Sequence, residues 1–570
     1  MLNMLNQRFG TQILSVLTGT SLPTRLQQAG STVKTFRSVL LMFAIIHILK
    51  PSPKLGRWDT GCMMLEMKNR KAMELMFRFI VFFQIVMFLL LSCKKEDDPD
   101  NPGTDPVVIT YEGKVLCDQK GIEGVVVTDG YACTVTDANG FYSLEYNSTA
   151  TNIYISSPAG YTVPVENSVP KFWVRLKSIS DKKNINFNLT KLSVSDTKHY
   201  FIAVGDPQVR NSAELDELKP ILDYMVQDIS TSGLNPVHLM VAGDIVFNTP
   251  NMHDQSKTYF SRVKQPVYYS IGNHDHVFDK TQTPSVNYDR TADSVYVRHY
   301  GPTYYSFNKG SVHYMVLDNI YFKGGADAEY TTQLTTTQLN WVKKDLSYVT
   351  KDKTLVLLFH SPTDSPYSSS LIGNSGDLYA LLTGYAGVHI ICGHTHYNYV
   401  VTDYPGITEH IVGAACGGWW EGPVCPDGAP LGYKIFEVDG TNVKWTYRSY
   451  VNPNEHFSVF KPGTRNALLP PADELLVNVW DWDKNWTVSW SADGGATFQQ
   501  MTQVSSRTYD PTAFEYFGAV DDTAVPAGRT WIEASPTYHI FKCVPPLVVN
   551  KVVIKVVDCF GREYRQDVNL

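Results

Sequence analysis

Five strand-like apolar runs in this chain each end in side chains that bind metals. The runs are YFIAVGDPQ, HLMVAGD, VYYSIGNHD, LVLLFHSP and VHIICGHTH, and helical stretches such as SAELDELKPILDYMVQDI lie between them. This alternation predicts an α/β layered domain, in which ligands collect at the carboxyl ends of strands. The polar residues at these five ends are Asp206, Gln208, Asp244, Asn273, His274, Asp275, His360, His394 and His396.

The residue types at the strand ends fit a divalent metal site. Carboxylate oxygens, amide oxygens and imidazole nitrogens all bind such ions. His394 and His396 are two positions apart, so an extended segment would place both on one side. Asp206 and Asp244 could instead begin ordinary turns. The presence of GNHD and GHTH further along the chain favours the metal site.

The ordered set GDxQ, GD, GNHD, H and GHTH resembles the calcineurin-like metallophosphoesterases over roughly residues 199–450. The resemblance implies an α/β (α+β layered) sandwich of two sheets with helices outside. It also implies two divalent ions (Mn, Fe or Zn), with a hydroxide between them that attacks phosphorus in line. One ion would bind Asp206, Gln208, Asp244 and His396. The other would bind Asp244, Asn273, His360 and His394, so that Asp244 bridges the pair. His274 would protonate or stabilise the leaving oxygen.

Three positions depart from patterns known in this family. Gln208 stands where the family usually has His, and an amide oxygen is a weaker ligand. Phe247 stands where protein Ser/Thr phosphatases have the Asp that orients the catalytic His, and Asp275 stands where they have Glu. The chain is therefore not expected to be a protein phosphatase, and His274 needs another partner.

Three further residues are candidates for substrate binding. Trp419 and Trp420 lie in the Gly-rich stretch ACGGWWEG and could stack on a sugar or base. They could equally pack against the C-terminal part of the chain. Asp275 could face the substrate or support the metal ligands, and the sequence leaves both alternatives open.

The beginning of the chain has the features of an export signal. Residues 67–92 combine a basic start, MKNRK, with the apolar run IVFFQIVMFLLL, which is too short to span a bilayer. The run ends in LLSC, which resembles a bacterial lipobox with Cys93 as the lipidated residue. This implies an exported protein, lipid-anchored to the outer membrane. The next residues, KKEDD, resemble a surface-export signal of Bacteroides-type lipoproteins.

The remaining segments give the predicted domain organisation. Residues 1–66 are interpreted as a non-native upstream extension, with a cytoplasmic tail as the alternative, and residues 93–106 as a tether. Residues 107–190 resemble a carboxypeptidase-regulatory-like β-sandwich, residues 195–451 form the phosphoesterase domain, and residues 452–570 form a second β domain. The pairs Cys416/Cys425 and Cys543/Cys559 are close enough in sequence to form disulfides.

The charge of the chain disfavours nucleic acid as a partner. The first 92 residues contain 11 of the 49 basic and 3 of the 56 acidic residues, which leaves a net charge of −15 for the rest. The predicted function is hydrolysis of a phosphomonoester or phosphodiester of a small molecule, lipid or glycan. The alternative is a non-catalytic surface binding lipoprotein with a decayed site. The sequence does not predict the oligomeric state.

Overall fold

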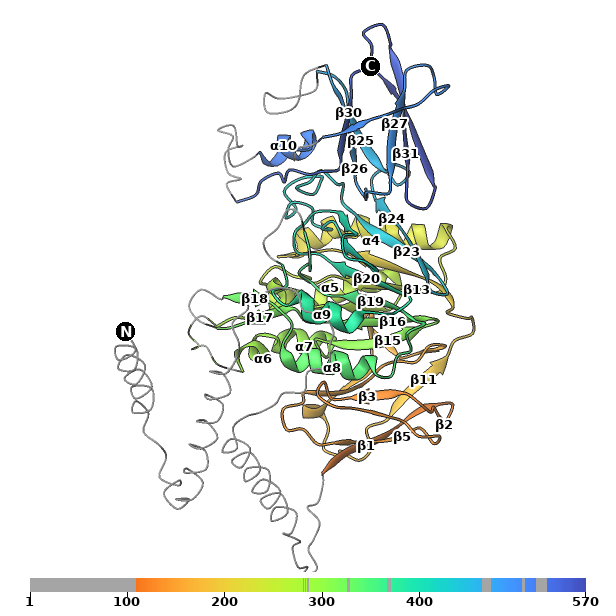
Figure 1. The fold of residues 1–570 in the computed structure, drawn as a ribbon. Helices are drawn as coiled ribbons and strands as arrows, with labels where there is room; N and C mark the ends of the chain where they lie inside the picture. Colours follow the sequence, from red (N-terminus) through yellow and green to blue (C-terminus); the bar gives the residue numbers. More distant parts are fainter. Residues whose placement is uncertain are drawn as a thin grey trace, which may run out of the picture. The chain divides into compact units, whose positions relative to one another are not determined.

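The computed structural model describes residues 109–570, except 280, 282, 284, 286, 325–328, 366–370, 464–472, 505–507 and 519–530 (Figure 1). These residues belong to one compact unit, Asp105–Leu570. The predicted upstream extension, the signal peptide, Cys93 and the whole tether lie outside them. Within the described residues, no helix is both long and apolar enough to cross a membrane.

The central domain is built on two mixed β-sheets that face each other. The first has the strand order β14-β13-β12-β23-β24 and the second β15-β16-β19-β20-β22-β21. The strands of the first sheet are β12 (Lys198–Val204), β13 (Val237–Val241), β14 (Val267–Tyr269), β23 (Gly432–Asp439) and β24 (Asn442–Ser449). Those of the second are β15 (Tyr305–Lys309), β16 (Val312–Val316), β19 (Thr354–Leu358), β20 (Gly387–Cys392), β21 (Tyr399–Val401) and β22 (Ile407–Ile411).

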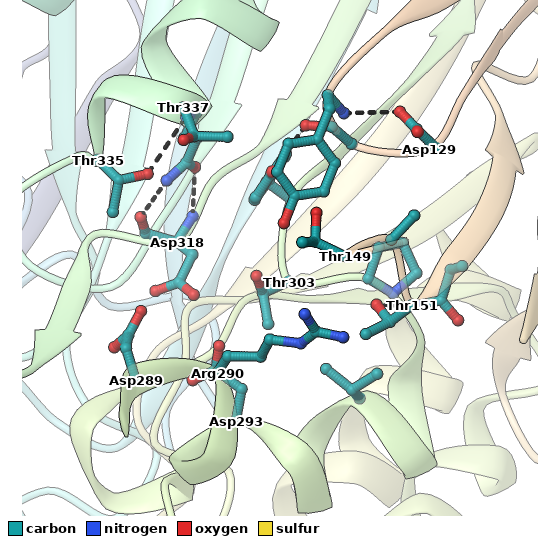
Figure 2. Close-up of a pocket in the computed structure, with 18 of the residues that line it drawn as sticks. Asp129, Thr149, Thr151, Asp289, Arg290, Asp293, Thr303, Asp318, Thr335 and Thr337 are labelled. Atoms are coloured by element: carbon teal, nitrogen blue, oxygen red, sulfur yellow. Dashed lines mark hydrogen bonds between the residues drawn. The ribbon is translucent and has the colours of Figure 1, made fainter. Parts of the chain in front are cut away.

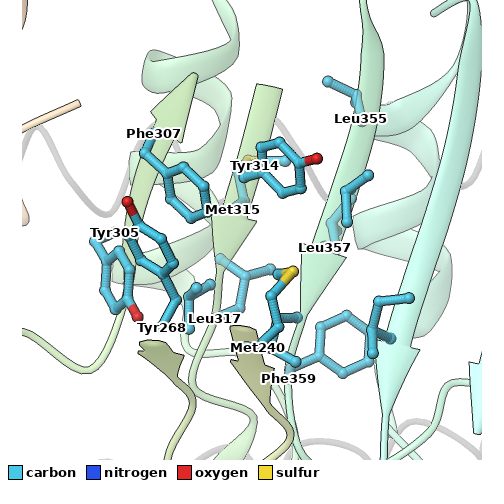
Figure 3. Close-up of a cluster of buried hydrophobic side chains, with 14 of the residues drawn as sticks. Met240, Tyr268, Tyr305, Phe307, Tyr314, Met315, Leu317, Leu355, Leu357 and Phe359 are labelled. Carbon is cyan, nitrogen blue, oxygen red and sulfur yellow. The ribbon is translucent and has the colours of Figure 1, made fainter. Parts of the chain in front are cut away.

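The core lies between these two sheets. Met240 and Tyr268 of the first sheet pack against Phe307, Tyr314 and Leu357 of the second (Figure 3). Every residue of β13, β16 and β19 is buried, because helices cover the outer faces of the sheets. This explains why these strands are continuous apolar runs rather than alternating ones.

Helices lie on the outer faces of both sheets. Leu215, Leu218 and Leu222 of α4 pack against β12 and β13, and Trp341 of α8 packs against the second sheet. The expected α/β sandwich with outer helices is thus confirmed. The helices are α4 (Ser212–Thr231), α5 (His253–Phe260), α6 (Tyr288–Ala292), α7 (Ser294–Tyr300), α8 (Thr336–Leu346), α9 (Ser375–Leu382) and, in the C-terminal domain, α10 (Pro511–Phe517).

An N-terminal β-sandwich precedes the central domain. One sheet has the order β2-β1-β11-β7, with β5 also paired to β1, and the other has the order β10-β6-β3-β4. Tyr304 donates a hydrogen bond to the carbonyl of Gly130, which joins this sandwich to the central domain. The strands are β1 (Thr110–Cys117), β2 (Lys120–Gly121), β3 (Val126–Thr128), β4 (Cys133–Val135), β5 (Phe141–Glu145), β6 (Asn152–Ile155), β7 (Tyr161–Thr162), β10 (Trp173–Arg175) and β11 (Phe187–Lys191), with a separate hairpin of β8 (Val165–Glu166) and β9 (Val169–Pro170).

The C-terminal domain is also a β-sandwich, with the sheet orders β25-β26-β30-β29 and β28-β27-β31-β32. Asn398, two residues after His396, donates its side-chain amide to the carbonyl of Trp480 at 2.7 Å. The N–H of Asn398 donates to Asp427 at 2.9 Å. The strands are β25 (Phe457–Phe460), β26 (Leu475–Val479), β27 (Thr487–Ser491), β28 (Gln499–Gln500), β29 (Thr502–Gln503), β30 (Ile540–Cys543), β31 (Lys551–Val557) and β32 (Glu563–Asn569).

The described cysteines are all free thiols. Neither of the two disulfides that the sequence spacing allowed is formed in the structure. Cys416 and Cys425 are fully buried in the central domain, where burial raises the pKa of both thiols well above its ordinary value.

Candidate metal centre

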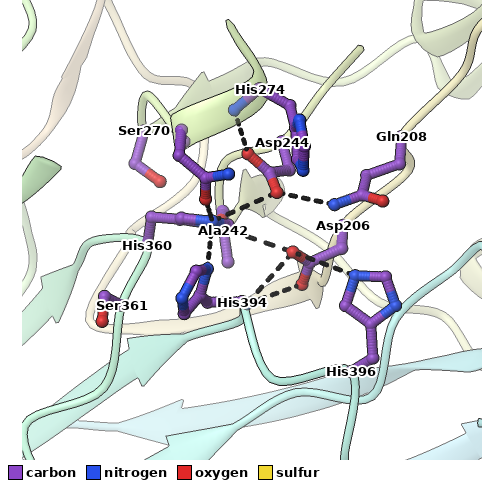
Figure 4. A network of polar contacts seen from close by, with 12 residues as sticks. Asp206, Gln208, Ala242, Asp244, Ser270, His274, His360, Ser361, His394 and His396 are labelled. Carbon is purple, nitrogen blue, oxygen red and sulfur yellow. Dashed lines mark hydrogen bonds and ion pairs between the residues drawn. The ribbon is translucent and has the colours of Figure 1, made fainter. Parts of the chain in front are cut away.

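The side chains predicted to bind metals converge at the carboxyl ends of the strands (Figure 4). The centre of the group is Nε2 of His360, which follows β19. This atom lies 3.0 Å from Oδ1 of Asn273, 3.1 Å from Nδ1 of His394 and 3.3 Å from Oδ2 of Asp244. Four donor groups from four loops, separated by up to 150 residues of sequence, therefore surround one small volume.

Three more predicted residues continue the group on the other side of Asp244. The side-chain amide of Gln208 lies 2.6 Å from Oδ2 of Asp244. Nε2 of His396 lies 3.8 Å from Oδ1 of Asp206. Both oxygens of Asp206 also accept the N–H of His394, each at 3.0 Å. Asp244 is thus the residue that the two halves of the group share.

The backbone at these loops turns sharply straight after each strand. Asp206, Gln208, Asp244, His394 and His396 all have positive φ, between 36° and 68°. Such a conformation is uncommon for residues other than glycine and costs about 1–3 kcal/mol at each position. Its repetition at five of the seven predicted ligands indicates that the loops are shaped for function rather than for stability.

The motif glycines permit the close approach of these loops. A Cβ atom at Gly272 would lie 2.2 Å from the backbone nitrogen of Asp244, and one at Gly243 would lie 2.6 Å from Nδ1 of His360. Neither space can hold a methyl group. Any other residue at either position would push the loops, and the side chains they carry, apart.

Backbone carbonyls fix which nitrogen of two histidines points into the group. Nδ1 of His360 lies 2.7 Å from the carbonyl of Ala242, and Nδ1 of His396 lies 2.8 Å from that of Gly417. A carbonyl can only accept, so each Nδ1 carries a proton and donates it. Each Nε2 therefore points into the group and, in the neutral ring, has the lone pair that a metal-binding imidazole needs.

Some buried hydrogen-bond acceptors in this group have no donor among the described residues. Oε1 of Gln208 and Nε2 of His396 are buried and have no hydrogen-bond partner among the described residues. Nε2 of His360 faces an amide oxygen, a carboxylate and another imidazole nitrogen at once. Buried acceptors without partners are unfavourable, and divalent cations are the group that such an N/O set binds. The residues present therefore fit a metal centre.

The titration of the two carboxylates shows the same excess of negative charge. Burial raises the pKa of Asp206 well above its ordinary value. Burial acts on Asp244 in the same direction, but His360 and His274 outweigh it and hold the pKa of Asp244 below its ordinary value. In the protein alone, Asp244 therefore stays ionised while Asp206 tends to keep its proton. A cation between them would allow both to ionise.

His274 is held beside the group without belonging to it. Its backbone N–H donates to Oδ1 of Asp244 at 2.8 Å. Its Nδ1 lies 3.1 Å from Oδ1 of Asn248, and its ring stacks on Phe247 with the centroids 4.1 Å apart. The sequence left the partner of His274 open because position 247 is Phe, and Asn248, one residue later, was missed. Positive φ at Asn248 turns its side chain toward the histidine.

The side chain of Asp275 points into the protein, toward backbone N–H groups of two loops. It is fully buried, and its oxygens accept the backbone N–H groups of Gly272, Ile245 and Val246 at 2.9, 2.9 and 3.1 Å. Of the two alternatives, the structure therefore favours the supporting role. Asp275 ties the loop after β13 to the loop after β14, which together carry Asp244, Asn273 and His274.

The two tryptophans occupy different positions near the group. The ring of Trp419 stacks on His396 with the centroids 4.2 Å apart, and it contacts Trp531 of the C-terminal domain edge-on. The indole N–H of Trp420 donates to the carbonyl of Pro207, in the loop that carries Asp206 and Gln208. Both side chains are half-buried. Trp419 is thus beside a predicted ligand, whereas Trp420 packs against a loop.

Comparison with known families agrees with this geometry. The family models that match are the N terminal of calcineurin-like phosphoesterase at residues 109–192, calcineurin-like phosphoesterase at residues 199–398, and the C terminal of calcineurin-like phosphoesterase at residues 409–564. Together they span more than half of the sequence. The chain belongs to the calcineurin-like phosphoesterases.

Solved structures resemble the chain at low sequence identity. A dimetal phosphatase from Danio rerio is 14% identical and has a TM-score of 0.32, covering 44% of this chain and 96% of its own. A purple acid phosphatase from yellow lupin is 13% identical with a TM-score of 0.35, covering 58% and 68%. A 5'-nucleotidase from Candida albicans is 13% identical with a TM-score of 0.29, covering 45% and 53%. No curated protein sequence matches the chain.

Proposed function

We propose that this phosphoesterase-family protein is an active hydrolase that cleaves a phosphate ester with two divalent ions. The observation that carries the proposal is the set of acceptors around Nε2 of His360, which lies within 3.3 Å of Asn273, His394 and Asp244. One ion would be held by Asp206, Gln208, Asp244 and His396. The other would be held by Asp244, Asn273, His360 and His394, and the ions would be Mn, Fe or Zn.

Two such ions, when bound, supply a Lewis acid for the phosphate oxygens and a nucleophilic water at neutral pH. The chain itself supplies the geometry. Asp244 is placed to serve both ions, and the carbonyls of Ala242 and Gly417 keep His360 and His396 in the tautomer that can bind metal. All the proposed ligands except the half-buried His394 are buried, which limits the access of bulk water to them.

His274 is the residue placed to handle the leaving group. Asn248 Oδ1 accepts from Nδ1 of His274, so Nε2 is free to interact with a substrate oxygen. Burial lowers the pKa of His274 from its ordinary value, although Asp244 acts in the opposite direction. As a general acid His274 acts in its doubly protonated form, and the lowered pKa makes that form a stronger acid but a less abundant one at neutral pH.

The substrate class follows from the site and from the charge of the chain. A phosphomonoester or phosphodiester of a small molecule, lipid or glycan fits a metal-dependent phosphoesterase centre. The net charge of −15 after residue 92 disfavours a polyanionic nucleic acid. The competing function is a surface binding protein with a decayed site, and the Gln208 substitution is the feature that favours it.

An assay with p-nitrophenyl phosphate and bis(p-nitrophenyl) phosphate separates these two functions. The metal-loaded protein should hydrolyse one of them, and both a chelator and Asp244→Asn should reduce the rate by about 100-fold or more. The matched control is Asp345→Asn, which removes another buried carboxylate that hydrogen-bonds a histidine, His313, outside the centre. Absence of turnover with Mn²⁺, Zn²⁺ or Fe²⁺ would support the decayed site.

The location of the protein is part of the same proposal. A lipidated Cys93 would anchor the chain to the outer membrane, with residues 93–106 as a tether, and export to the cell surface would bring the site to external substrates. Mass spectrometry of the native N-terminus tests this directly. A lipid-modified Cys93 is expected, and an unmodified chain that begins at Met1 would contradict it.

A further inference from the structure

A second cluster of potential metal ligands lies behind the loop that carries Asn273 and His274. It contains His276, with Asp289 of α6 and Asp293 at the end of that helix. One ligand atom from each of these three side chains lies within 4.8 Å of the other two. None of these residues belongs to the predicted metal centre. The side chain of His276 is completely buried, and that of Asp293 is 11% exposed.

His276 presents a lone pair to this cluster. Its Nδ1 lies 2.8 Å from the carbonyl of Gly272, which can only accept, so Nδ1 carries the proton. The unprotonated Nε2 lies 3.0 Å from Oδ1 of Asp293. Both atoms are buried, and neither has a hydrogen-bond partner among the described residues. A contact this short between an imidazole nitrogen and a carboxyl oxygen needs either a proton or a cation between the two atoms.

The spacing of these atoms fits two ligands of one ion. Imidazole nitrogens and carboxylate oxygens bind zinc at about 2.0–2.2 Å, so neighbouring ligands of one ion are about 3.0–3.5 Å apart. The pair His313 and Asp345 provides a contrast. Its Nε2–Oδ2 distance of 2.8 Å is a hydrogen bond, and Nδ1 of His313 is satisfied by Asn308. The pair at 313 and 345 is not part of a cluster of carboxyl groups, whereas the pair at 276 and 293 has Asp289 and Asp318 beside it.

The carboxyl groups of the cluster have no Lys or Arg partner among the described residues, and they resist ionisation in the protein alone. Asp318 lies next to it, and the carboxyl groups of Asp289 and Asp318 point toward each other (Figure 2). No Lys or Arg forms an ion pair with Asp289, Asp293 or Asp318 in the part of the chain that the structure describes. Burial raises the pKa of Asp293 to about 8, and burial together with Asp293 raises that of Asp289 to about 7. Arg290, on the same helix, points into the neighbouring cavity instead.

The cavity gives an ion a route to the cluster. It has a volume of about 690 Å³ and lies between the N-terminal β-sandwich and the central domain (Figure 2). Asp289, Asp293 and Asp318 form part of its wall, together with Asp129 and Arg175 of the sandwich. An ion can therefore reach the three carboxylates without passing through the predicted catalytic centre.

We propose that His276, Asp289 and Asp293, with Asp318 beside them, form a separate binding site for one divalent transition-metal ion. An imidazole with two or three carboxylates is a donor set that suits Zn²⁺ or Mn²⁺. The bound ion would tie His276 to α6 and to β17 (Ile320–Phe322), because Asp289 accepts the N–H of Phe322 and Asp318 that of Ile320. It would thereby hold the loop of Asn273 and His274 from behind.

Metal counting tests this site independently of catalysis. The full chain is stripped with chelator, dialysed against Zn²⁺ or Mn²⁺ at about 10 μM, and measured by ICP mass spectrometry. We expect Asp293→Asn and His276→Gln each to lose one equivalent of ion per chain, while Asp345→Asn retains the wild-type number. Equal numbers in the wild type and in both variants, with unchanged circular dichroism, would overturn the proposal.

The Asp244→Asn background separates this proposal from that of the catalytic centre. In this background we expect one equivalent of ion to remain, and the further change Asp293→Asn to remove it. If Asp244→Asn alone removes all bound metal, the separate site does not exist, even if the hydrolase does. If the buried replacements do not fold, Asp289→Asn, whose side chain is only partly buried, takes their place with the same expected loss and the same contradicting result.

Discussion

Nδ1 of His274 lies 3.1 Å from the side-chain oxygen of Asn248, in a loop where the expected carboxylate partner is absent. A neutral amide thus orients the proposed acid, where protein Ser/Thr phosphatases are expected to use an aspartate. An amide fixes the ring but does not stabilise its protonated form as a carboxylate would. The chain therefore keeps the geometry of the pair while altering its electrostatics.

Replacing Asn248 should affect turnover rather than substrate binding. Asn248→Ala removes the acceptor for Nδ1, so the ring of His274 loses its orientation, and we expect kcat to fall about 10-fold or more with KM changed less than threefold. Asn248→Asp should retain the hydrogen bond and move the basic limb of the kcat–pH profile to higher pH, because a carboxylate favours the protonated ring. An Asn248→Ala protein with unchanged kcat would show that the contact does not matter.

Removing metal should destabilise the folded protein. The acceptors of Gln208 and His396 have no partner among the described residues, so bound cations should stabilise the native state by at least about 2.7 kcal/mol at 100 times the Kd. Differential scanning calorimetry should show Tm falling by about 5 °C or more after chelation and recovering with Mn²⁺ or Zn²⁺. A Tm that does not respond to either treatment would contradict the metal centre.

The two tryptophans should differ in their effects. Trp419 stacks on His396, so Trp419→Ala should raise KM for p-nitrophenyl phosphate about fivefold or more if its ring also contacts the ester. Trp420 donates to the carbonyl of Pro207, so Trp420→Ala should lower Tm and leave KM nearly unchanged. Equal KM values for both variants would assign both rings to packing alone.

His238 of β13 should be a destabilising residue in the wild-type chain. Both ring nitrogens are buried with no hydrogen-bond partner among the described residues, and aromatic rings surround them, including Phe201 and Tyr314. Replacing the ring by an apolar one removes a cost of about 1–3 kcal/mol for each unpaired group. We therefore expect His238→Phe to raise Tm.

The same substitution should change the dependence of stability on pH. Burial, with smaller effects of Lys309 and His199, lowers the pKa of His238 well below its ordinary value of 6.5. The unfolded chain therefore takes up a proton below pH 6.5 that the folded chain does not, so folding loses stability as the pH falls. The Tm advantage of His238→Phe should be larger at about pH 5.5 than at about pH 8. An advantage that shrinks as the solution is acidified would contradict this assignment.

Sequence alone was sufficient for the sheet architecture and for the convergence of the predicted ligands. Asp206 and Asp244 follow neighbouring parallel strands of one sheet, so the pattern of the runs places them along one edge. His360 follows β19 of the second sheet, and its place beside them depends on how the two sheets pack. It was not sufficient for Asn248 or for the role of Asp275. Those assignments depend on the direction of a side chain in an irregular loop, which apolar periodicity does not report.

The cluster of His276, Asp289 and Asp293 was missed for a different reason. Asp289 and Asp293 are one helical turn apart and resemble ordinary polar residues of a solvated helix face. Only the fold brings them against His276 and buries them together. No short motif connects position 276 with position 293, so the sequence gives no signal for this contact.

Asn398 connects the central domain to the C-terminal sandwich. This residue is next but one to His396. Its side-chain amide donates to the carbonyl of Trp480 in the C-terminal sandwich, and its backbone N–H donates to Asp427 of the central domain. A fragment cut near residue 451 would retain every proposed ligand and yet lose the contact with Trp480. The C-terminal sandwich therefore supports the segment that carries His396. Moving the central domain into another scaffold would require moving the C-terminal sandwich with it.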